Sequence, residues 1–252
     1  NETVYGIHPL GKEVIYSKTN SATNKKGSFL LNNSFYNFSP IASRLFSYCQ
    51  NPEEAYMADG TATLYKIKNY KSEKYIVIDT LISYPDYRTK INTIFELNDN
   101  LLIGTSDGLS VYSFKTKKYK NFSNQLFSFG INDIKHFNNK TYLAHENGIT
   151  IFEDSILIQE IGTQQLTAVK KIKFYQNRIW IATLDGLFIC DNKFQPIVIY
   201  NKSNGLLSNT INDVVFNGDN CCICSDKGIT ICAINDLLKQ ARPANKLFIT
   251  SL

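Results

Sequence analysis

One eight-residue pattern recurs four times from residue 102 onward, and it limits how the chain can fold more than any other feature. It opens with an apolar run and ends on glycine followed by leucine or isoleucine, as in Leu102 to Leu109. The four glycines are Gly108, Gly148, Gly186 and Gly228, at spacings of 40, 38 and 42 residues. A regular period of this length is typical of repeat proteins, in which one structural unit stacks on copies of itself.

Each copy of the pattern predicts a β-hairpin. An apolar run meets Asp-Gly, Asn-Gly or Lys-Gly and is followed by a second alternating run, such as Leu109 to Tyr112. Runs of this kind are joined by a tight turn with positive φ at the glycine. A further strand precedes each hairpin and another follows it. The preceding strands open at Ile91, Ile131, Val169 and Ile211, with the same spacings as the repeat glycines. Four antiparallel strands per period predict one blade of a β-propeller.

The first ninety residues follow the pattern less closely. Residues 55–60, 63–67 and 75–78 are typical of a diverged blade, and residues 13–16 and 28–31 of another before it. The chain is therefore predicted to be all-β, a propeller of about six four-stranded blades. Its 252 residues, divided among six blades, give a blade length that agrees with the period of the repeat. Closing such a ring needs a strand borrowed from the opposite terminus, and we expect residues 3–7 to complete the last blade beside residues 229–233. The alternative is a segment of a larger propeller.

Composition supports a folded all-β chain and excludes several classes of protein. With 43% hydrophobic residues, 15 Tyr and 16 Phe, the chain is not intrinsically disordered. No apolar run reaches the roughly 18 residues of a membrane span, and residues 1–10 do not form a signal peptide. The net charge of +5 is mild, and the clusters of lysine suit solvated strands better than a nucleic-acid stripe. We therefore predict no nucleic-acid partner, and membrane attachment only through segments outside this chain.

The turn and strand residues resemble the two-component regulator propeller repeat. Residues 204–211, Asn-Gly-Leu-Leu-Ser-Asn-Thr-Ile, match its turn, and residues 179–187 and 101–109 match its Trp-Ile-Gly-Thr-x-x-Gly-Leu strand signature. The likeness is clearest over residues 91–235. Residues 245–252 resemble the opening strand of the triple-tyrosine, immunoglobulin-like domain that usually follows such propellers.

This resemblance implies a division of the chain and a function. It implies a propeller over residues 1–240, with residues 241–252 as a linker and the start of an immunoglobulin-like domain. It also implies the periplasmic, extracytoplasmic sensor region of a membrane-anchored bacterial receptor, either a hybrid histidine kinase or a one-component relative. Such receptors respond to glycan breakdown products. The kinase domain would lie outside this chain, and the receptor is expected to act as a homodimer with an oligosaccharide as ligand.

The residues themselves predict no catalytic, metal or cofactor site. Glycosidase or hydrolase chemistry needs paired carboxylates or a nucleophile with its base. The acids nearest the pattern, Asp107, Asp185 and Asp226, lie in its turns, where aspartate supports the backbone. The three histidines, His8, His136 and His145, lie in different predicted blades. The single tryptophan, Trp180, is interpreted as core packing. A propeller glycosidase or lyase, and a structural or protein-interaction module, remain the alternatives.

The cysteines are interpreted as small buried residues. Cys222 and Cys224 share one face of a predicted strand, while Cys221 points the other way, because side chains alternate along a strand. In the register of the repeat Cys222, Cys224 and Cys232 occupy core positions. A bridge between Cys190 and Cys232, or a similar pair, is the alternative.

The turn that leads into the first strand of each blade is the predicted ligand-binding region. Loops at this end of a propeller usually reach the face where ligands bind. Polar residues there vary between copies while their apolar neighbours stay fixed, which is the pattern of a binding face and also of a solvated turn. The predicted binding residues are Arg44, Arg88, Lys90, Asn132, Lys170 and Asn212.

Overall fold

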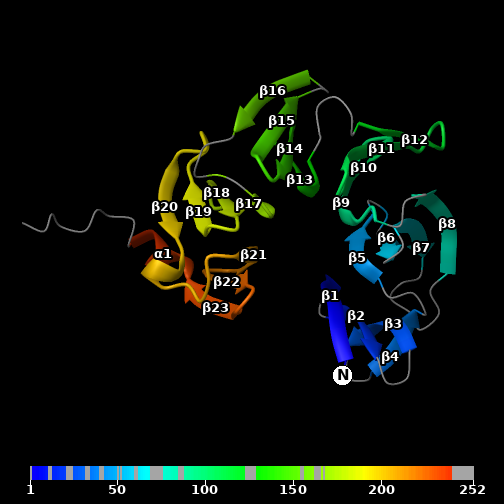
Figure 1. Cartoon of the computed structure of the whole chain (residues 1–252), viewed down its shortest axis with the longest axis horizontal. Coiled ribbons are helices and arrows are strands. Elements are labelled where there is room, and N and C mark those ends of the chain that lie inside the picture. Colours follow the sequence, from blue (N-terminus) through cyan, green and yellow to red (C-terminus); the bar gives the residue numbers. More distant parts are fainter. Residues whose placement is uncertain are drawn as a thin grey trace, which may run out of the picture. The chain divides into compact units, whose positions relative to one another are not determined.

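The chain consists almost entirely of β-strands. The computed structural model describes residues 2–239 except 11–12, 21–24, 32–34, 40–42, 50, 52, 60–61, 69–75, 85–87, 123–128, 154–155, 162–165 and 167. For β1 to β4 it describes the backbone alone. The described strands form six antiparallel sheets, five of four strands and one of three (Figure 1). In every sheet the strands pair in chain order, so each sheet is a simple meander.

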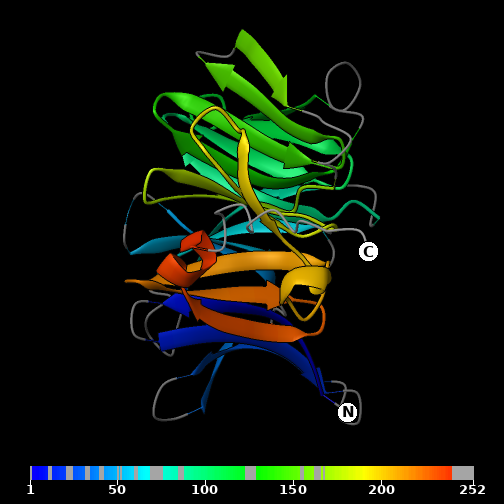
Figure 2. The same ribbon diagram turned by 90° about the vertical axis from the view of Figure 1, so that its left-hand side faces the viewer.

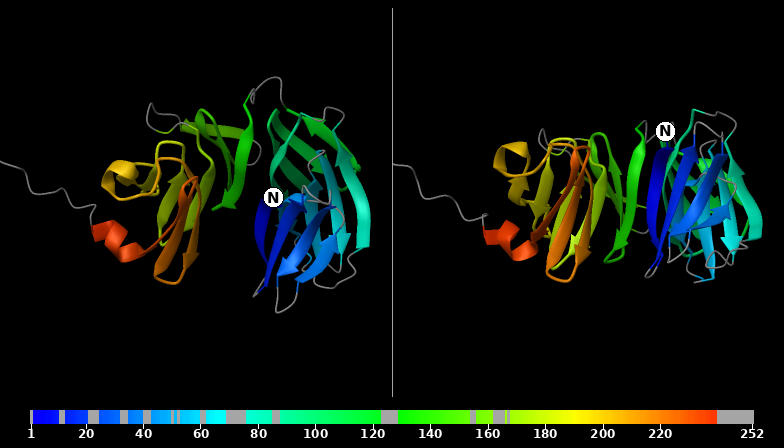
Figure 3. Two further views of the ribbon diagram at one scale, coloured as in Figure 1. Left: turned by 60° about the horizontal axis from the view of Figure 1, so that its bottom comes forward. Right: turned by 90° about the horizontal axis from the view of Figure 1, so that it is seen from below.

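Contacts divide the chain into two compact units, and the first is Asn1–Ile131. It holds three four-stranded sheets, whose strands lie beside one another in Figure 3. Their strands are β1 (Glu2–Leu10), β2 (Glu13–Asn20), β3 (Lys25–Leu31) and β4 (Phe35–Ser39); β5 (Ser43–Tyr48), β6 (Glu54–Asp59), β7 (Thr63–Lys68) and β8 (Ile76–Ser83); and β9 (Ile91–Leu97), β10 (Asn100–Thr105), β11 (Gly108–Ser113) and β12 (Lys118–Asn121).

The second unit, Asn132–Leu252, holds the other three sheets. The last of these has three described strands and is followed by a short helix, drawn in orange and red in Figure 2. The elements are β13 (Ile131–Phe137), β14 (Lys140–His145), β15 (Gly148–Glu153) and β16 (Ile156–Ile161); β17 (Lys171–Tyr175), β18 (Arg178–Ala182), β19 (Leu187–Cys190) and β20 (Pro196–Tyr200); the 3-10 turn η1 (Lys202–Asn204); and β21 (Ile211–Asn217), β22 (Asn220–Ser225), β23 (Gly228–Ala233) and α1 (Ile234–Lys239).

Repeated meanders of this length define a propeller-type fold, and they confirm the predicted all-β class and the six repeats. One expectation about the chain ends was wrong. Residues 3–7 belong to β1, which pairs with β2 in the first sheet, with Ile7 opposite Tyr16. The reason lies in the alternating run at residues 13–20, which follows β1 directly and pairs with it locally. Residues 241–252, where we predicted a second domain, lie outside the described residues.

The turns of the repeat are two residues long. Ser106 and Asp107 connect β10 to β11, and Gly108 is already paired with Thr105 as the first residue of its strand. Gly108, Gly148, Gly186 and Gly228 all have positive φ, between 129° and 136°, as predicted. The two turn residues therefore lie before the glycine, one position earlier in the sequence than expected. At Gly186 a Cβ would also collide with the backbone oxygen of Tyr200, so this position excludes every residue but glycine.

The core lies between successive sheets inside each unit. In the second unit, Trp180 and Ile189 of one sheet pack with Val214, Cys221 and Ile223 of the next, and all are nearly inaccessible to solvent. The Trp180 and Phe216 rings also make an edge-to-face contact, at 5.0 Å between centroids. The prediction that Trp180 is a core residue is therefore confirmed. Within the second unit, the sheet β17–β20 is apolar on both faces because it packs against a neighbouring sheet on each side.

Candidate functional site

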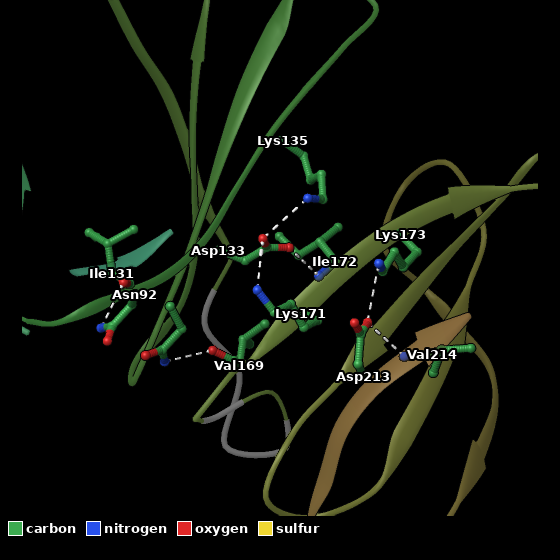
Figure 4. A network of polar contacts seen from close by, with 11 residues as sticks. Asn92, Ile131, Asp133, Lys135, Val169, Lys171, Ile172, Lys173, Asp213 and Val214 are labelled. Atoms are coloured by element: carbon green, nitrogen blue, oxygen red, sulfur yellow. Dashed lines mark hydrogen bonds and ion pairs between the residues drawn. The ribbon is translucent and has the colours of Figure 1, made fainter. Parts of the chain in front are cut away.

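The second position of the motif that opens four of the first strands carries a polar side chain. Three of these side chains donate to a residue in the next copy of the motif, and the fourth accepts one of these bonds. We call Asn92, Asn132, Lys170 and Asn212 the link residues. In the first unit, Asn92 Nδ2 donates to the Ile131 backbone oxygen at 3.1 Å, and in the second unit Asn132 Nδ2 donates to that of Val169 at 2.9 Å (Figure 4). Lys170 Nζ donates to Asn212 Oδ1 at 2.8 Å. Among the predicted binding residues, Lys170 and Asn212 thus bond each other, and Asn132 bonds Val169, the residue before Lys170.

The ammonium group of Lys170 lies where sheets β17–β20 and β21–β23 meet. Partial burial lowers the pKa of Lys170, and the Asp226 carboxylate opposes this effect. Asp226 lies in the turn between β22 and β23 and is exposed, as is Asn212. A partly dehydrated ammonium between an amide and a carboxylate is a polar group that a hydroxyl-rich or anionic ligand can reach from solvent.

Beside the link residues, a charged network ties the first strands together. The carboxylate of Asp133 is 1% exposed and accepts hydrogen bonds from Lys135 Nζ at 3.2 Å, Lys171 Nζ at 3.3 Å and the Ile172 amide at 3.0 Å (Figure 4). The last two bonds join β13 to β17. An acceptor that satisfies a buried backbone N–H on another sheet has a structural role first.

A second ion pair continues the network to the last sheet. Lys173 Nζ of β17 lies 3.2 Å from Asp213 Oδ1 of β21, and both side chains are about one-third exposed. The Asp213 Oδ1 atom also accepts from the neighbouring Val214 amide at 2.8 Å. Lysines of β17 therefore bridge aspartates on the strands of both adjacent sheets (Figure 4).

In the first unit, the predicted binding residues Arg88 and Lys90 flank a buried threonine ahead of β9. Both are exposed, and the hydroxyl of Thr89 between them donates to Asp107 Oδ2 at 2.6 Å. Ser106 in the hairpin turn holds the Lys90 backbone through bonds to its N–H and its oxygen. Arg44 lies on β5, but its side chain is outside the described part. The structure thus brings together three of the six predicted residues, and the ligand-binding role of all six stays a prediction.

A hydroxyl that the sequence reasoning missed stabilises the hairpin turns. Thr105, Thr183 and Ser225 each stand three residues before a repeat glycine. Each hydroxyl donates to the backbone oxygen of that glycine at 2.9–3.0 Å. It also accepts a hydrogen bond, at 3.0–3.2 Å, from the backbone N–H of the residue directly before the glycine. At the equivalent position His145 accepts the Asn147 amide through Nδ1. The signal was present in the sequence as a hydroxyl or histidine at a fixed distance before each glycine.

The described contacts of the acids and histidines of the repeat are with hydroxyl groups, a backbone amide and a lysine, and the side chain of His8 lies outside the described part. Asp107 bonds Thr89, Asp226 pairs with Lys227 at 3.9 Å, and buried His145 contacts Thr150 Oγ1 at 2.9 Å. His136 Nδ1 lies 3.1 Å from Thr141 Oγ1 in the same sheet. Within the part of the chain that is described, no three His, Cys, Asp or Glu side chains lie close enough together to hold a metal ion.

The cysteines divide into buried and partly exposed groups. Cys49, Cys190 and Cys221 are buried, and the interpretation as small core residues holds for them. Cys222, Cys224 and Cys232 are only partly buried, so that interpretation was wrong for these three. Cys222 and Cys224 occupy the repeat positions equivalent to Trp180 and Ala182. Trp180 and Ala182 are covered by the following sheet, whereas the corresponding face of β21–β23 is exposed at Ile229 and Ile231.

The fold and this row of polar links define a propeller-type repeat protein with a polar rim where successive sheets join. Two solved structures of the extracellular domain of one B. thetaiotaomicron protein are similar to it, one described as a one-component system and the other as a hybrid two-component system. Each has a TM-score of 0.61 and 15% identity, covering 91% of this chain and 38% of its own. The computationally designed Ika8 protein has a TM-score of 0.59 and 9% identity, covering 92% of this chain and 71% of its own.

At these identities the likeness shows the fold alone. The chain spans well under half the length of the B. thetaiotaomicron domains it matches. No family model matches the chain, and no curated protein does either. In the described part, none of the helices has the length and apolar character needed to cross a bilayer.

Proposed function

We propose that this chain is a non-catalytic, ligand-sensing domain of an extracytoplasmic bacterial signalling receptor, and that its ligand is an oligosaccharide. Two observations support the sensing role. The fold is shared with extracellular domains of a one-component or hybrid two-component system. The residues that join successive sheets at one rim are polar, and Lys170 and Asn212 are accessible there.

The observation that carries the proposal is the bond between Lys170 and Asn212. It joins two sheets through side chains, so a ligand that binds these groups contacts both sheets at once. Sugar hydroxyls donate and accept hydrogen bonds, and they match an ammonium donor beside an amide. A ligand that binds one arrangement of the sheets better than another shifts the equilibrium between them. In the receptor this shift would pass to a membrane-anchored effector region, with the receptor as a homodimer.

Thermal unfolding of the chain with a panel of oligosaccharides tests the proposal. We expect one class of oligosaccharide to raise the unfolding temperature, since a ligand that binds only the folded state stabilises it. Chromatography of the same mixtures should show the oligosaccharide unchanged. Turnover would favour the glycosidase or lyase alternative, and no response from the panel would favour a structural or protein-interaction module.

Matched variants connect the response to the rim. Lys170→Ala and Asn212→Ala should each reduce the shift in unfolding temperature at a given ligand concentration. Lys193→Ala is the control, because Lys193 is exposed in the turn between β19 and β20 and takes part in the described contacts through its backbone. A ligand shift that survives in Lys170→Ala and Asn212→Ala would place the binding region elsewhere.

A further inference from the structure

Two cysteine side chains face each other across the last hairpin. Cys221 of β22 and Cys232 of β23 are direct partners in the strand register, and their sulfur atoms lie 3.6 Å apart. Directly opposite residues of antiparallel strands have Cα atoms about 4.5–5.5 Å apart, inside the range of about 4.4–6.8 Å that disulfides span. A rotation of the side chains is therefore enough to bring the sulfur atoms into bonding distance.

The other four cysteines lack such a partner among the described residues. Cys222 and Cys224 point to the opposite face of β22, where they stand opposite Ile231 and Ile229. Cys190 stands opposite Ile179 within its own sheet. Cys49, in the first unit, is buried and hydrogen-bonded to Tyr56. The bridge between Cys190 and Cys232 that we considered from the sequence is thus replaced by a better-placed pair.

We propose that Cys221 and Cys232 form a cross-strand disulfide that fastens β23 to β22. The other edge of β23 has no partner strand in the described part, so β23 is held in its sheet by one ladder alone. Ile229 and Ile231 on this strand are also 62% and 71% exposed, which leaves β23 with less packing than the described third strands β7, β11, β15 and β19. A covalent link compensates for the missing strand by restricting how far β23 can separate.

The reaction is a thiol–disulfide exchange with a small disulfide such as oxidised glutathione. Cys232 is the more accessible thiol, and its thiolate attacks one sulfur of glutathione disulfide to give a mixed disulfide and one glutathione thiolate. The Cys221 thiolate then attacks Cys232 Sγ and releases the second glutathione. Two cysteine thiols are oxidised, one glutathione disulfide is reduced to two glutathiones, and the two cysteine protons pass to the glutathione thiolates or to water.

Burial determines how fast this exchange runs. Burial raises the pKa of Cys221 to about 12 and also raises the pKa of Cys232. Thiolate is the attacking species, so its population, and with it the rate, should rise by about ten-fold per pH unit below these pKa values. In a cell the link needs the oxidising compartment that the proposed function implies. The geometry of the hairpin is independent of ligand binding, so either proposal can fail without the other.

Thiol mapping on the purified, reduced chain tests the disulfide. After equilibration with a glutathione redox buffer at mildly alkaline pH, free thiols are alkylated and the protein is analysed by mass spectrometry. We expect four of the six thiols to be alkylated, and a linked pair of tryptic peptides, residues 203–227 and 228–239, that dithiothreitol separates. The oxidised chain should also unfold at a higher temperature than the same chain with dithiothreitol.

Two variants identify the partner of Cys232. Cys221→Ala should abolish the linked peptides, whereas Cys222→Ala, one residue away on the opposite face, should retain them. A link that persists in Cys221→Ala would overturn the proposal. So would six free thiols, or glutathione adducts without a link, in the wild-type chain, and this readout needs no variant to fold.

Discussion

The hydroxyl of Thr183 satisfies two backbone groups of a hairpin turn. It is fully buried, donates to the Gly186 oxygen at 2.9 Å and accepts the Asp185 amide at 3.0 Å. Thr183→Val keeps the shape of the side chain but leaves both groups without this partner, and we expect it to lower the free energy of unfolding by about 1–3 kcal/mol. Urea unfolding measures the change.

Thr183→Ser is the matched control, because serine retains the hydroxyl and loses only a methyl group. We expect it to cost less than half as much as Thr183→Val. Equal costs for the two variants would show that packing of the methyl group, rather than the two hydrogen bonds, stabilises the turn.

Sequence reasoning was more successful for apolar residues than for polar ones at this scale. Trp180 was predicted as core because its slot is apolar in every copy, and it is 1% exposed. Asn132 and Lys170 were chosen because they vary between copies, yet both bond the next sheet. Burial follows from a periodic pattern, whereas a contact between residues 37 or 42 positions apart depends on how two sheets meet.

Among the strands, Asp133 makes the strongest polar connection between two sheets. Its buried carboxylate accepts the Ile172 amide and two lysine ammonium groups. Asp133→Ala leaves that buried N–H unpaired, and we expect a loss of about 2–3 kcal/mol in the free energy of unfolding. Asp213→Ala removes a pair that is about one-third exposed and should cost less than about 1 kcal/mol.

Chemical denaturation of the two aspartate variants separates these roles. Added salt should weaken the contribution of Asp213 more than that of Asp133, because solvent ions screen exposed pairs more effectively. Similar losses for both variants, or a larger loss for Asp213→Ala, would contradict the assignment of Asp133 as the main connection between β13 and β17.

Equivalent positions on successive sheets differ in burial, and this difference is testable. Ile189 of β19 and Ile231 of β23 are each three residues after a repeat glycine, but Ile189 is fully buried and Ile231 is 71% exposed. Ile189→Lys should unfold the sheet or cost more than about 3 kcal/mol, while Ile231→Lys should stay within about 0.5 kcal/mol of wild type. A large loss of stability from Ile231→Lys would show that this face is covered in solution.

The strands of the repeat could be predicted from the sequence because the same signals occur in each copy. Alternation, a two-residue turn and a positive-φ glycine agree from residue 91 onward, and the structure has meanders there. The pairing of β1 could not be predicted correctly, since the side-chain pattern of a strand does not by itself select its partner. The exposed face of β21–β23 was missed for a related reason: a periodic sequence predicts which residues face a neighbour, but not whether that neighbour is present.

For the molecule as a whole, the account rests on ligand recognition where polar side chains connect successive sheets. Amide hydrogen exchange, measured with and without the oligosaccharide that most raises the unfolding temperature, tests this most directly. We predict slower exchange in peptides that contain residues 168–172 and 209–213, unchanged exchange in β20, and intact oligosaccharide at the end of the experiment. Protection confined to other segments, or conversion of the oligosaccharide to product, would contradict the account.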